Sequence, residues 1–236
     1  MIKAVLFDLD GTLLPMDQDK FIEAYMATMA KKLAQYGYEP KALAKGIWAG
    51  IGATVKNDGT KTNEEVFWNN FCAVLGEHTR NDAAIFRDYY ENEFQGVKET
   101  CGYEKRSKEV LDYLKEKGYR IVLATNPLFP AIATESRIRW AGLTPQDFEW
   151  YTTYENSSFC KPNPKYYLEI LEKTGLTPEE CIMVGNDVTE DMVAKTLGMK
   201  VFLLTNDLIN KEEKDISEYP NGGFEELMEY FKVSLS

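Results

Sequence analysis

The sequence predicts an α/β fold in which a parallel, Rossmann-like sheet is interrupted after its first strand by an all-helical insertion. Two observations predict the sheet: short apolar, partly β-branched runs recur along the chain, and amphipathic helical segments lie between the later ones. A third observation predicts the insertion, because residues 17–97 show one helical pattern after another. We therefore expect an α/β core of residues 1–16 and 98–236, and a helical cap of residues 17–97.

In chain order, five apolar runs are expected to form buried strands, at residues 2–9, 119–125, 148–153, 181–185 and 200–205. Core helices are expected at residues 104–117, 130–141, 164–174, 189–197 and 224–232. A glycine follows each of the first four core helices, where a left-handed residue commonly ends a helix. Cap helices are expected at residues 17–36, 40–56, 62–77 and 81–94, with breaks at Gly37, Asp58–Gly59 and His78–Thr79.

Composition excludes some classes of partner. The formal net charge of −11 disfavours binding to nucleic acid and to anionic membranes. It does not disfavour a small anionic substrate, because a local cation or a bound metal can reverse the field inside a cleft. The cysteines are scattered and are expected to be reduced thiols. No apolar run approaches the length that spans a bilayer, and the first strand reaches Asp8 too early for a signal peptide. We expect a cytoplasmic protein of undetermined oligomeric state.

The strongest functional signal is Asp8-Leu9-Asp10-Gly11-Thr12, at the end of the first predicted strand. Residues two apart on a strand face the same side, so Asp8 and Asp10 are expected to project together from the edge where open α/β sheets bind ligands. Two adjacent carboxylates are unfavourable unless a cation or a proton separates their charges. Gly11 is expected to turn the backbone and to leave amides open to an anion. Two surface carboxylates at the start of a loop are the alternative.

Three further segments lie where ligand-binding residues are expected. Thr125-Asn126 follows the second strand and offers a hydroxyl and amides to phosphoryl oxygens, although such residues also form ordinary turns. Lys161 lies between Cys160 and a Pro-Asn-Pro helix start and could neutralise a phosphate or a carboxylate. Asp187, after Gly185-Asn186, and Asp191 could complete a site for a hard cation, or could simply compensate the start of a helix.

Taken in order, Asp-Leu-Asp-Gly-Thr, Thr-Asn, Lys-Pro-Asn-Pro and Gly-Asn-Asp with a later Asp resemble the four motifs of the haloacid dehalogenase-like hydrolases. The resemblance covers residues 1 to about 206. The helical stretch resembles the cap that this superfamily inserts between its first two motifs, as in its phosphoglycolate phosphatase and β-phosphoglucomutase-like members. The resemblance implies that the strands preceding Asp8 and Asp187 are neighbours in the sheet.

The resemblance also implies roles for these residues in a Mg²⁺-dependent phosphatase acting on a small phosphorylated metabolite. Asp8 is then the nucleophile that forms an aspartyl-phosphate, and Asp10 is the general acid and base. The magnesium ligands are Asp8, the carbonyl of Asp10, and Asp187. The expected phosphate-binding residues are Gly11, Thr125, Asn126 and Lys161, and the lysine also keeps Asp8 ionised. Asp191 steadies the waters of the metal or the lysine.

Several alternatives remain open at this point. Asn186 rather than Asp187 could occupy the metal position, with the same uncertainty between Glu190 and Asp191. A phosphomutase acting on a sugar phosphate would use the same nucleophile, and a non-catalytic binding protein could use the same fold. Asp10 favours a phosphatase over a dehalogenase, because the family's dehalogenases lack an aspartate there. A dinucleotide-binding domain is disfavoured, since no Gly-x-Gly turn follows the first strand.

Overall fold

The computed structural model describes residues 1–235. Its six-stranded sheet has the order β3-β2-β1-β4-β5-β6, and every pairing is parallel. The strands are β1 (Ala4–Phe7), β2 (Arg120–Leu123), β3 (Trp150–Tyr151), β4 (Cys181–Gly185), β5 (Lys200–Leu204) and β6 (Asn221–Gly222). The chain leaves β1 toward β2 and later returns to its other side at β4, so the strand order reverses at β1, where ligands bind in such sheets. The predicted α/β fold with a helical insertion is confirmed.

Helices cover both faces of the sheet. Alternating residues of β1 divide between two buried clusters, Val5 and Phe7 in one, Ala4 and Leu6 in the other. The first cluster packs against α5 (Lys105–Glu116), α6 (Ala131–Trp140) and α8 (Phe224–Ser234). The second packs against α7 (Pro164–Thr174) and the 3₁₀ helix η6 (Met192–Leu197). This layering leaves the carboxyl ends of the strands free to form a site.

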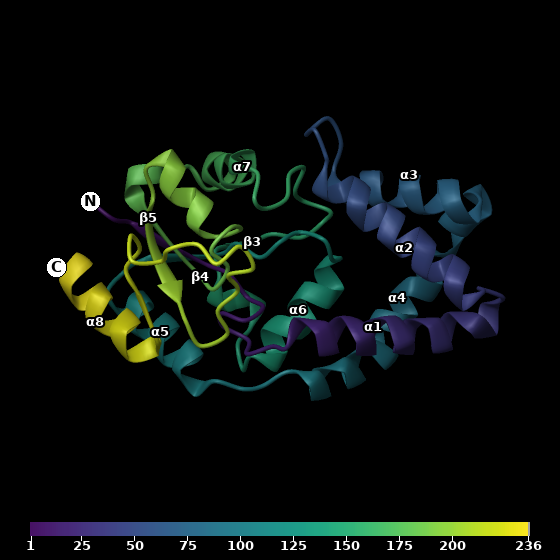
Figure 1. Ribbon diagram of the computed structural model, residues 1–236, viewed down its shortest axis with the longest axis horizontal. Helices are drawn as coiled ribbons and strands as arrows, with labels where there is room; N and C mark the ends of the chain where they lie inside the picture. The colour runs from purple at the N-terminus through teal and green to yellow at the C-terminus, as the bar shows by residue number, and fades with distance from the viewer. Residues whose placement is uncertain (236) are drawn as a thin grey trace.

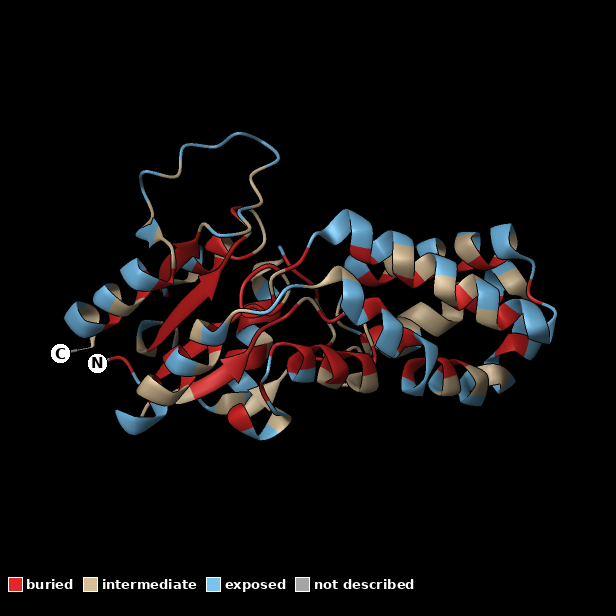
Figure 2. Ribbon diagram, turned by 90° about the horizontal axis from the view of Figure 1, so that it is seen from below, coloured by how far each residue is buried: buried red, intermediate tan, exposed pale blue. Residues whose placement is uncertain are grey.

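The helical cap follows β1 and forms a separate lobe at one end of the molecule (Figure 1). Its helices are α1 (Gln18–Leu33), α2 (Pro40–Val55), α3 (Asn63–Leu75) and α4 (Ala83–Glu91), joined by the 3₁₀ helices η1 (Ala34–Tyr36), η2 (Glu77–Asp82) and η3 (Glu93–Thr100). Buried aromatic rings fill the lobe, including Phe21, Tyr25, Phe71, Phe86 and Phe94. In Figure 2, each cap helix has buried residues on the side that faces the other helices and exposed residues on its outer side. This is the amphipathic pattern that predicted the helices.

Two chain segments connect the cap to the core, and they lie side by side. Met16 and Cys101 form an antiparallel bridge, and the amide of Gly102 donates to the carbonyl of Pro15 at 2.8 Å. The helical structure runs to Thr100, three residues past the predicted end of the cap at residue 97. The domain division at residues 16/17 and 97/98 stays a prediction.

Several elements differ from those predicted. Residues 189–197 form only turns and η6, because the carboxylates of Asp187 and Asp191 accept nearby backbone amides and hold the chain in turns. The strand expected at residues 148–153 is reduced to β3, an edge strand that pairs only with β2. His78–Thr79 lies inside η2 rather than in a break. In residues 1–235 no helix is long and apolar enough to cross a membrane.

Candidate active site

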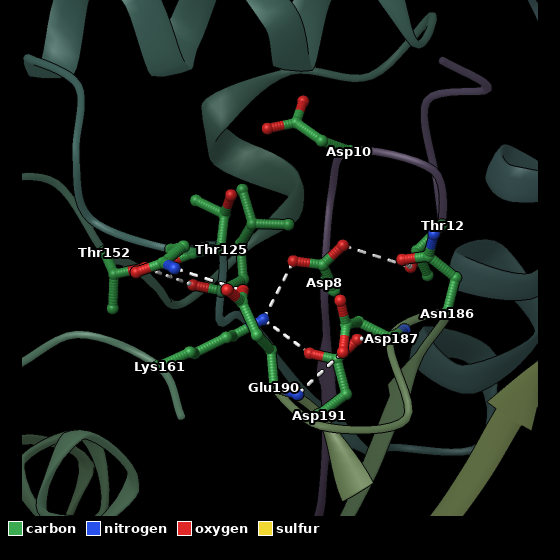
Figure 3. Close-up of polar contacts among 12 residues, drawn as sticks. Asp8, Asp10, Thr12, Thr125, Thr152, Lys161, Asn186, Asp187, Glu190 and Asp191 are labelled. Carbon is green, nitrogen blue, oxygen red and sulfur yellow. Dashed lines mark hydrogen bonds and ion pairs between the residues drawn. The ribbon is translucent and has the colours of Figure 1, made fainter. Parts of the chain in front are cut away.

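Side chains from four separate segments meet at the carboxyl ends of the central strands (Figure 3). Asp8 directly follows β1, Thr125 follows β2, Asn186 and Asp187 follow β4, and Lys161 enters from the loop before α7. All of these residues except Lys161 line a cleft with a volume of about 110 Å³. The cleft is lined by Asp8, Asp10, Gln18, Thr125, Asn126, Asn186, Asp187, Glu190, Asp191 and Lys211. The structure thus brings the segments expected from the sequence to one edge of the sheet.

Lys161 is the buried cation at the centre of the site. Its ammonium group donates to Oδ1 of Asp8 at 2.8 Å and to Oδ1 of Asp191 at 2.6 Å. The lysine and Asp191 side chains are each 1% exposed. Burial by itself lowers the pKa of Lys161, but Asp191 and Asp8 outweigh it and hold that pKa well above its usual value. The lysine therefore stays charged and forms ion pairs with two carboxylates at once.

The remaining oxygen of Asp8 connects it to the loop after β4. Its Oδ2 accepts from the hydroxyl of Thr12 at 3.1 Å, and the same hydroxyl lies 3.1 Å from Oδ1 of Asn186. The amide of Asn186 donates to the carbonyl of Asp207 at 2.6 Å. Both polar ends of Asn186 are therefore engaged in joining the loop after β1 to the loop after β5. Thr12, to which the sequence assigned no role, lies between the two motifs.

Asp10 lines the same cleft as Asp8, but its carboxylate does not point the same way as the two-residue spacing predicted. Figure 3 shows its carboxylate turned away from Asp8, and its Oδ2 forms an ion pair with the guanidinium of Arg137. The expectation that the two carboxylates project together is wrong, because the chain bends after β1 and each carboxylate has its own cation. Burial raises the pKa of Asp10, while Arg137 lowers it. Arg137 lies on α6 and was not predicted from the sequence.

Two expected phosphate-binding groups have protein partners. The amide of Gly11 donates to the carbonyl of Leu14 at 2.8 Å, so the expectation that this amide is open to an anion is wrong. The side-chain amide of Asn126 donates to Oε2 of Glu190 at 3.1 Å. Burial raises the pKa of Glu190 to about 7. The carbonyl of Thr125 accepts from the hydroxyls of Thr152 and Tyr166, which fixes the backbone beside the cleft.

Asp187 has a carboxylate oxygen available to a ligand. Its Oδ1 accepts from the amides of Thr189 and Glu190, at 2.7 and 2.8 Å. These bonds orient the side chain and leave Oδ2 as an acceptor at the cleft. Within residues 1–235, no group of three or more His, Cys, Asp or Glu side chains could hold a metal ion. The predicted magnesium set is smaller, with two carboxylates and one backbone carbonyl, and such hard oxygen donors fit Mg²⁺.

Two further lining residues were also missed from the sequence. Gln18 opens the first helix of the cap, and Lys211 lies on the loop between β5 and β6. Ile209 holds that loop at the site, because its amide donates to the carbonyl of Asn186 and its carbonyl accepts from the amide of Val188. An exposed lysine on a polar loop gives no sequence signal that separates it from ordinary surface residues.

Comparison with known proteins identifies relatives of the whole chain. The family model described as haloacid dehalogenase-like hydrolase matches residues 2–198. A glyceraldehyde 3-phosphate phosphatase from Methanothermobacter thermautotrophicus is 30% identical over 231 residues, which is 92% of each chain. A 2-haloacid dehalogenase from Pseudomonas syringae superposes with a TM-score of 0.66 at 19% identity, over 99% of this chain and 100% of that chain.

A second solved structure is similar in fold. It is a family enzyme from Bacteroides thetaiotaomicron in complex with magnesium and inorganic phosphate, with a TM-score of 0.54 and 19% identity, over 92% of this chain and 98% of that chain. At these identities both structural comparisons show the fold alone. The dehalogenase and the magnesium- and phosphate-bound enzyme therefore share an architecture with this chain, and the choice between their chemistries rests on the residues of the cleft.

Proposed function

Since the chain belongs to the haloacid dehalogenase-like hydrolases, we propose that it is a phosphatase that hydrolyses a small phosphorylated metabolite through an aspartyl-phosphate on Asp8. The observation that carries the proposal is the buried contact of Lys161 with Asp8 and Asp191, at the end of the central strand. The ammonium group of the lysine contacts Asp8, which lines the cleft of about 110 Å³. An ionised carboxylate at such a position is a nucleophile.

The proposed reaction has two steps. In the first, a carboxylate oxygen of Asp8 bonds to phosphorus while the bond from phosphorus to the leaving oxygen breaks, and Asp10 gives that oxygen a proton. In the second, water attacks the phosphorus of the aspartyl-phosphate, the bond from phosphorus to Asp8 breaks, and Asp10 takes back a proton from the water. Inorganic phosphate and an alcohol are the products, and both aspartates return to their starting states.

The separation of the two carboxylates suits this chemistry. In an in-line displacement the leaving oxygen lies on the side of phosphorus opposite the attacking oxygen. An acid beside Asp8 would be at the wrong end of the reacting bond. Asp10 lines the same cleft as Asp8 but is turned away from it (Figure 3), and it is the only residue of the Asp-Leu-Asp-Gly-Thr segment besides Asp8 with an acidic side chain.

Lys161 and Thr125 are proposed to bind the phosphoryl oxygens. Lys161 would do so through its charged ammonium group, and Thr125 through its hydroxyl. Asp8, the carbonyl of Asp10 and Asp187 are the proposed ligands of Mg²⁺. When bound, the ion would neutralise the charge of the phosphoryl group. Asp187 is favoured over Asn186, because both polar ends of Asn186 have protein partners, whereas Oδ2 of Asp187 is available. Asp191 accepts a hydrogen bond from the ammonium group of Lys161, and Glu190 accepts one from the side-chain amide of Asn126.

The substrate is proposed to be a short, phosphorylated compound. Five acidic side chains and the exposed side chain of Lys211 line the cleft. The acidic residues are Asp8, Asp10, Asp187, Glu190 and Asp191. The related glyceraldehyde 3-phosphate phosphatase acts, by its name, on a compound of this size. A cytoplasmic location stays a prediction.

The test is a phosphate-release screen with Mg²⁺ over short phosphorylated metabolites, including glyceraldehyde 3-phosphate and 2-phosphoglycolate. We expect the wild type to release phosphate, Asp8→Asn to release none, and Asp10→Asn to lose about 10²- to 10⁴-fold in turnover. Trapping with labelled substrate should give a phosphoenzyme that Asp8→Asn does not form. Full turnover by Asp8→Asn would refute the mechanism, and an isomeric phosphate in place of free phosphate would identify a mutase.

A further inference from the structure

Arg137 is a buried cation that contacts the proposed acid of the reaction but does not line the cleft. Its side chain is 1% exposed, and its guanidinium forms an ion pair with Oδ2 of Asp10. It also lies over the ring of Phe129, 4.5 Å from the ring centroid. Its Nε is 3.4 Å from the carbonyl of Ala133. A guanidinium held on several sides is a rigid partner, and its contact fixes the carboxyl group that it touches.

The two oxygens of Asp10 are in different situations. Oδ2 is engaged by Arg137, whereas Oδ1 is buried and has no hydrogen-bond partner. Within residues 1–235, the other buried side-chain polar atom without a partner is Oδ1 of Asn126, and both residues line the cleft. Buried polar atoms normally have a hydrogen-bond partner, and leaving one without a partner is unfavourable. Two such atoms in one cleft indicate that a ligand or water completes them.

We propose that Arg137 is a positioning residue, which holds Asp10 through Oδ2 and reserves Oδ1 for proton exchange with the substrate's leaving oxygen. The inference rests on the proposed function. Because Arg137 occupies Oδ2, Oδ1 is the oxygen of Asp10 that remains for a contact with the leaving oxygen. Without Arg137, the carboxyl group would be free to rotate, and Oδ1 would no longer be directed at the leaving oxygen.

The contacts of Phe129 extend this arrangement to the helical cap. Its ring packs edge-on against Phe21 and Tyr25 of α1, with centroids 6.1 and 5.4 Å away. One ring of the core therefore contacts both the guanidinium that holds Asp10 and the first helix of the cap. Arg137 thus connects the acid, through Phe129, to the first helix of the cap.

The experiment compares two leaving groups in the wild type, Arg137→Met and Arg137→Lys. Nitrophenolate leaves without a proton at neutral pH, whereas an alkoxide needs one, so only alkyl phosphates require a correctly placed acid. We expect Arg137→Met to lower kcat/KM by about 10²-fold for a short alkyl phosphate. For p-nitrophenyl phosphate we expect a loss below about 5-fold, because general acid catalysis contributes little to the departure of nitrophenolate. Arg137→Lys should restore part of the alkyl phosphate activity, because it keeps the charge.

Two controls make the result specific. Arg139→Met removes an exposed arginine of the same helix that pairs with Glu135, and it should leave both rates unchanged. Adding Arg137→Met to Asp10→Asn should cause no further loss with the alkyl phosphate, since both changes act on one group. Retained nitrophenyl phosphate activity shows that each variant is folded.

The outcomes separate this inference from the proposed function. Equal losses with both substrates, or no loss in Arg137→Met, would overturn the positioning role while leaving the phosphatase intact. Independent, multiplying losses in the double variant would also overturn it. A wild type that hydrolyses neither substrate, nor any other in the metabolite screen, would overturn the proposed function and the positioning role together.

Discussion

At the scale of single residues, three carboxylates of the site are paired with two buried cations. Lys161 serves Asp8 and Asp191, and Arg137 serves Asp10. An unpaired charge in such surroundings is strongly unfavourable, whereas a paired and hydrogen-bonded one is tolerated. The pairing stabilises three of the five acids that line the cleft of this chain of net charge −11.

Replacing Lys161 should therefore destabilise the fold as well as abolish turnover. In Lys161→Met the carboxylates of Asp8 and Asp191 remain buried without their shared cation, and breaking a buried pair in this way costs about 3–5 kcal/mol. We expect the free energy of unfolding, measured by urea denaturation in metal-free buffer, to fall by that amount. Adding Asp191→Asn should recover part of the loss, because one of the two stranded charges is removed.

Lys165→Met is the matched control for that measurement. Lys165 is an exposed lysine on the same segment, and its ammonium lies over the ring of Phe159 at 5.5 Å. Its removal should change the free energy of unfolding by less than about 1 kcal/mol. Equal stabilities of Lys161→Met and Lys165→Met would contradict the view that Lys161 stabilises two buried carboxylates.

At the scale of elements, the turn after β1 depends on a close approach that only glycine allows. Gly11 has a φ of +84°, and a Cβ atom there would lie 2.3 Å from the side-chain nitrogen, Nδ2, of Asn186. The side chain of Asn186 joins this turn to the loops after β4 and β5 through Thr12 and Asp207. The position of Gly11 therefore determines whether three loops meet at the cleft.

Gly11→Ala should lower the stability more than Gly37→Ala does, although the two substitutions introduce nearly the same backbone strain. Gly37 has a φ of +87°, and a Cβ atom added there would meet nothing within 4 Å, so its substitution should cost only about 1–2 kcal/mol of left-handed strain. Gly11→Ala also displaces Asn186 and disrupts two hydrogen bonds, adding about 1–3 kcal/mol. Thermal and urea unfolding of both variants measure the difference. Equal losses of stability would mean that Asn186 does not join the loops as described.

The elements also show what sequence can and cannot predict. The buried strands β1, β2, β4 and β5 were predicted because apolar runs mark strands that are covered on both faces. β6 was missed, since Asn221–Gly222 pairs through its backbone alone and has no apolar pattern. The α-helix expected at residues 189–197 is mostly η6 and turns, because hydrogen bonds from Asp187 and Asp191 compete with helix formation there.

Within the site, the sequence predicted the residues that follow strands, and Lys161 before a Pro-Asn-Pro helix start, but not Arg137 and Lys211. Asp8, Thr125 and Asp187 meet because parallel strands end at one edge of the sheet, and Lys161 joins them from the loop before α7. Arg137 lies one helix away, and Lys211 lies on a polar loop. Their positions depend on how α6 and that loop pack, which no local pattern encodes. The direction of Asp10 was mispredicted for the same reason, since its partner is distant in sequence.

At the scale of the whole molecule, the fold places the reversal of strand order, the cleft and the two connections to the cap at one end of the sheet. The resemblance to the haloacid dehalogenase-like hydrolases is confirmed by a family match over residues 2–198. Because Gln18 of the cap and Asp8 of the core both line the cleft, a ligand bound there contacts both lobes. Binding to the folded state alone raises the stability of the entire chain.

Magnesium with inorganic phosphate should therefore raise the melting temperature of the protein. A ligand at a hundred times its Kd adds about 2.7 kcal/mol, which corresponds to roughly 5–10 °C for a chain of this length. Asp187→Asn should abolish the shift, since it removes the proposed anionic ligand. Asn186→Ala should begin from a lower melting temperature, having lost its contacts with Thr12 and Asp207, but should keep the shift. If Asn186→Ala lost the shift and Asp187→Asn kept it, the metal position would belong to Asn186.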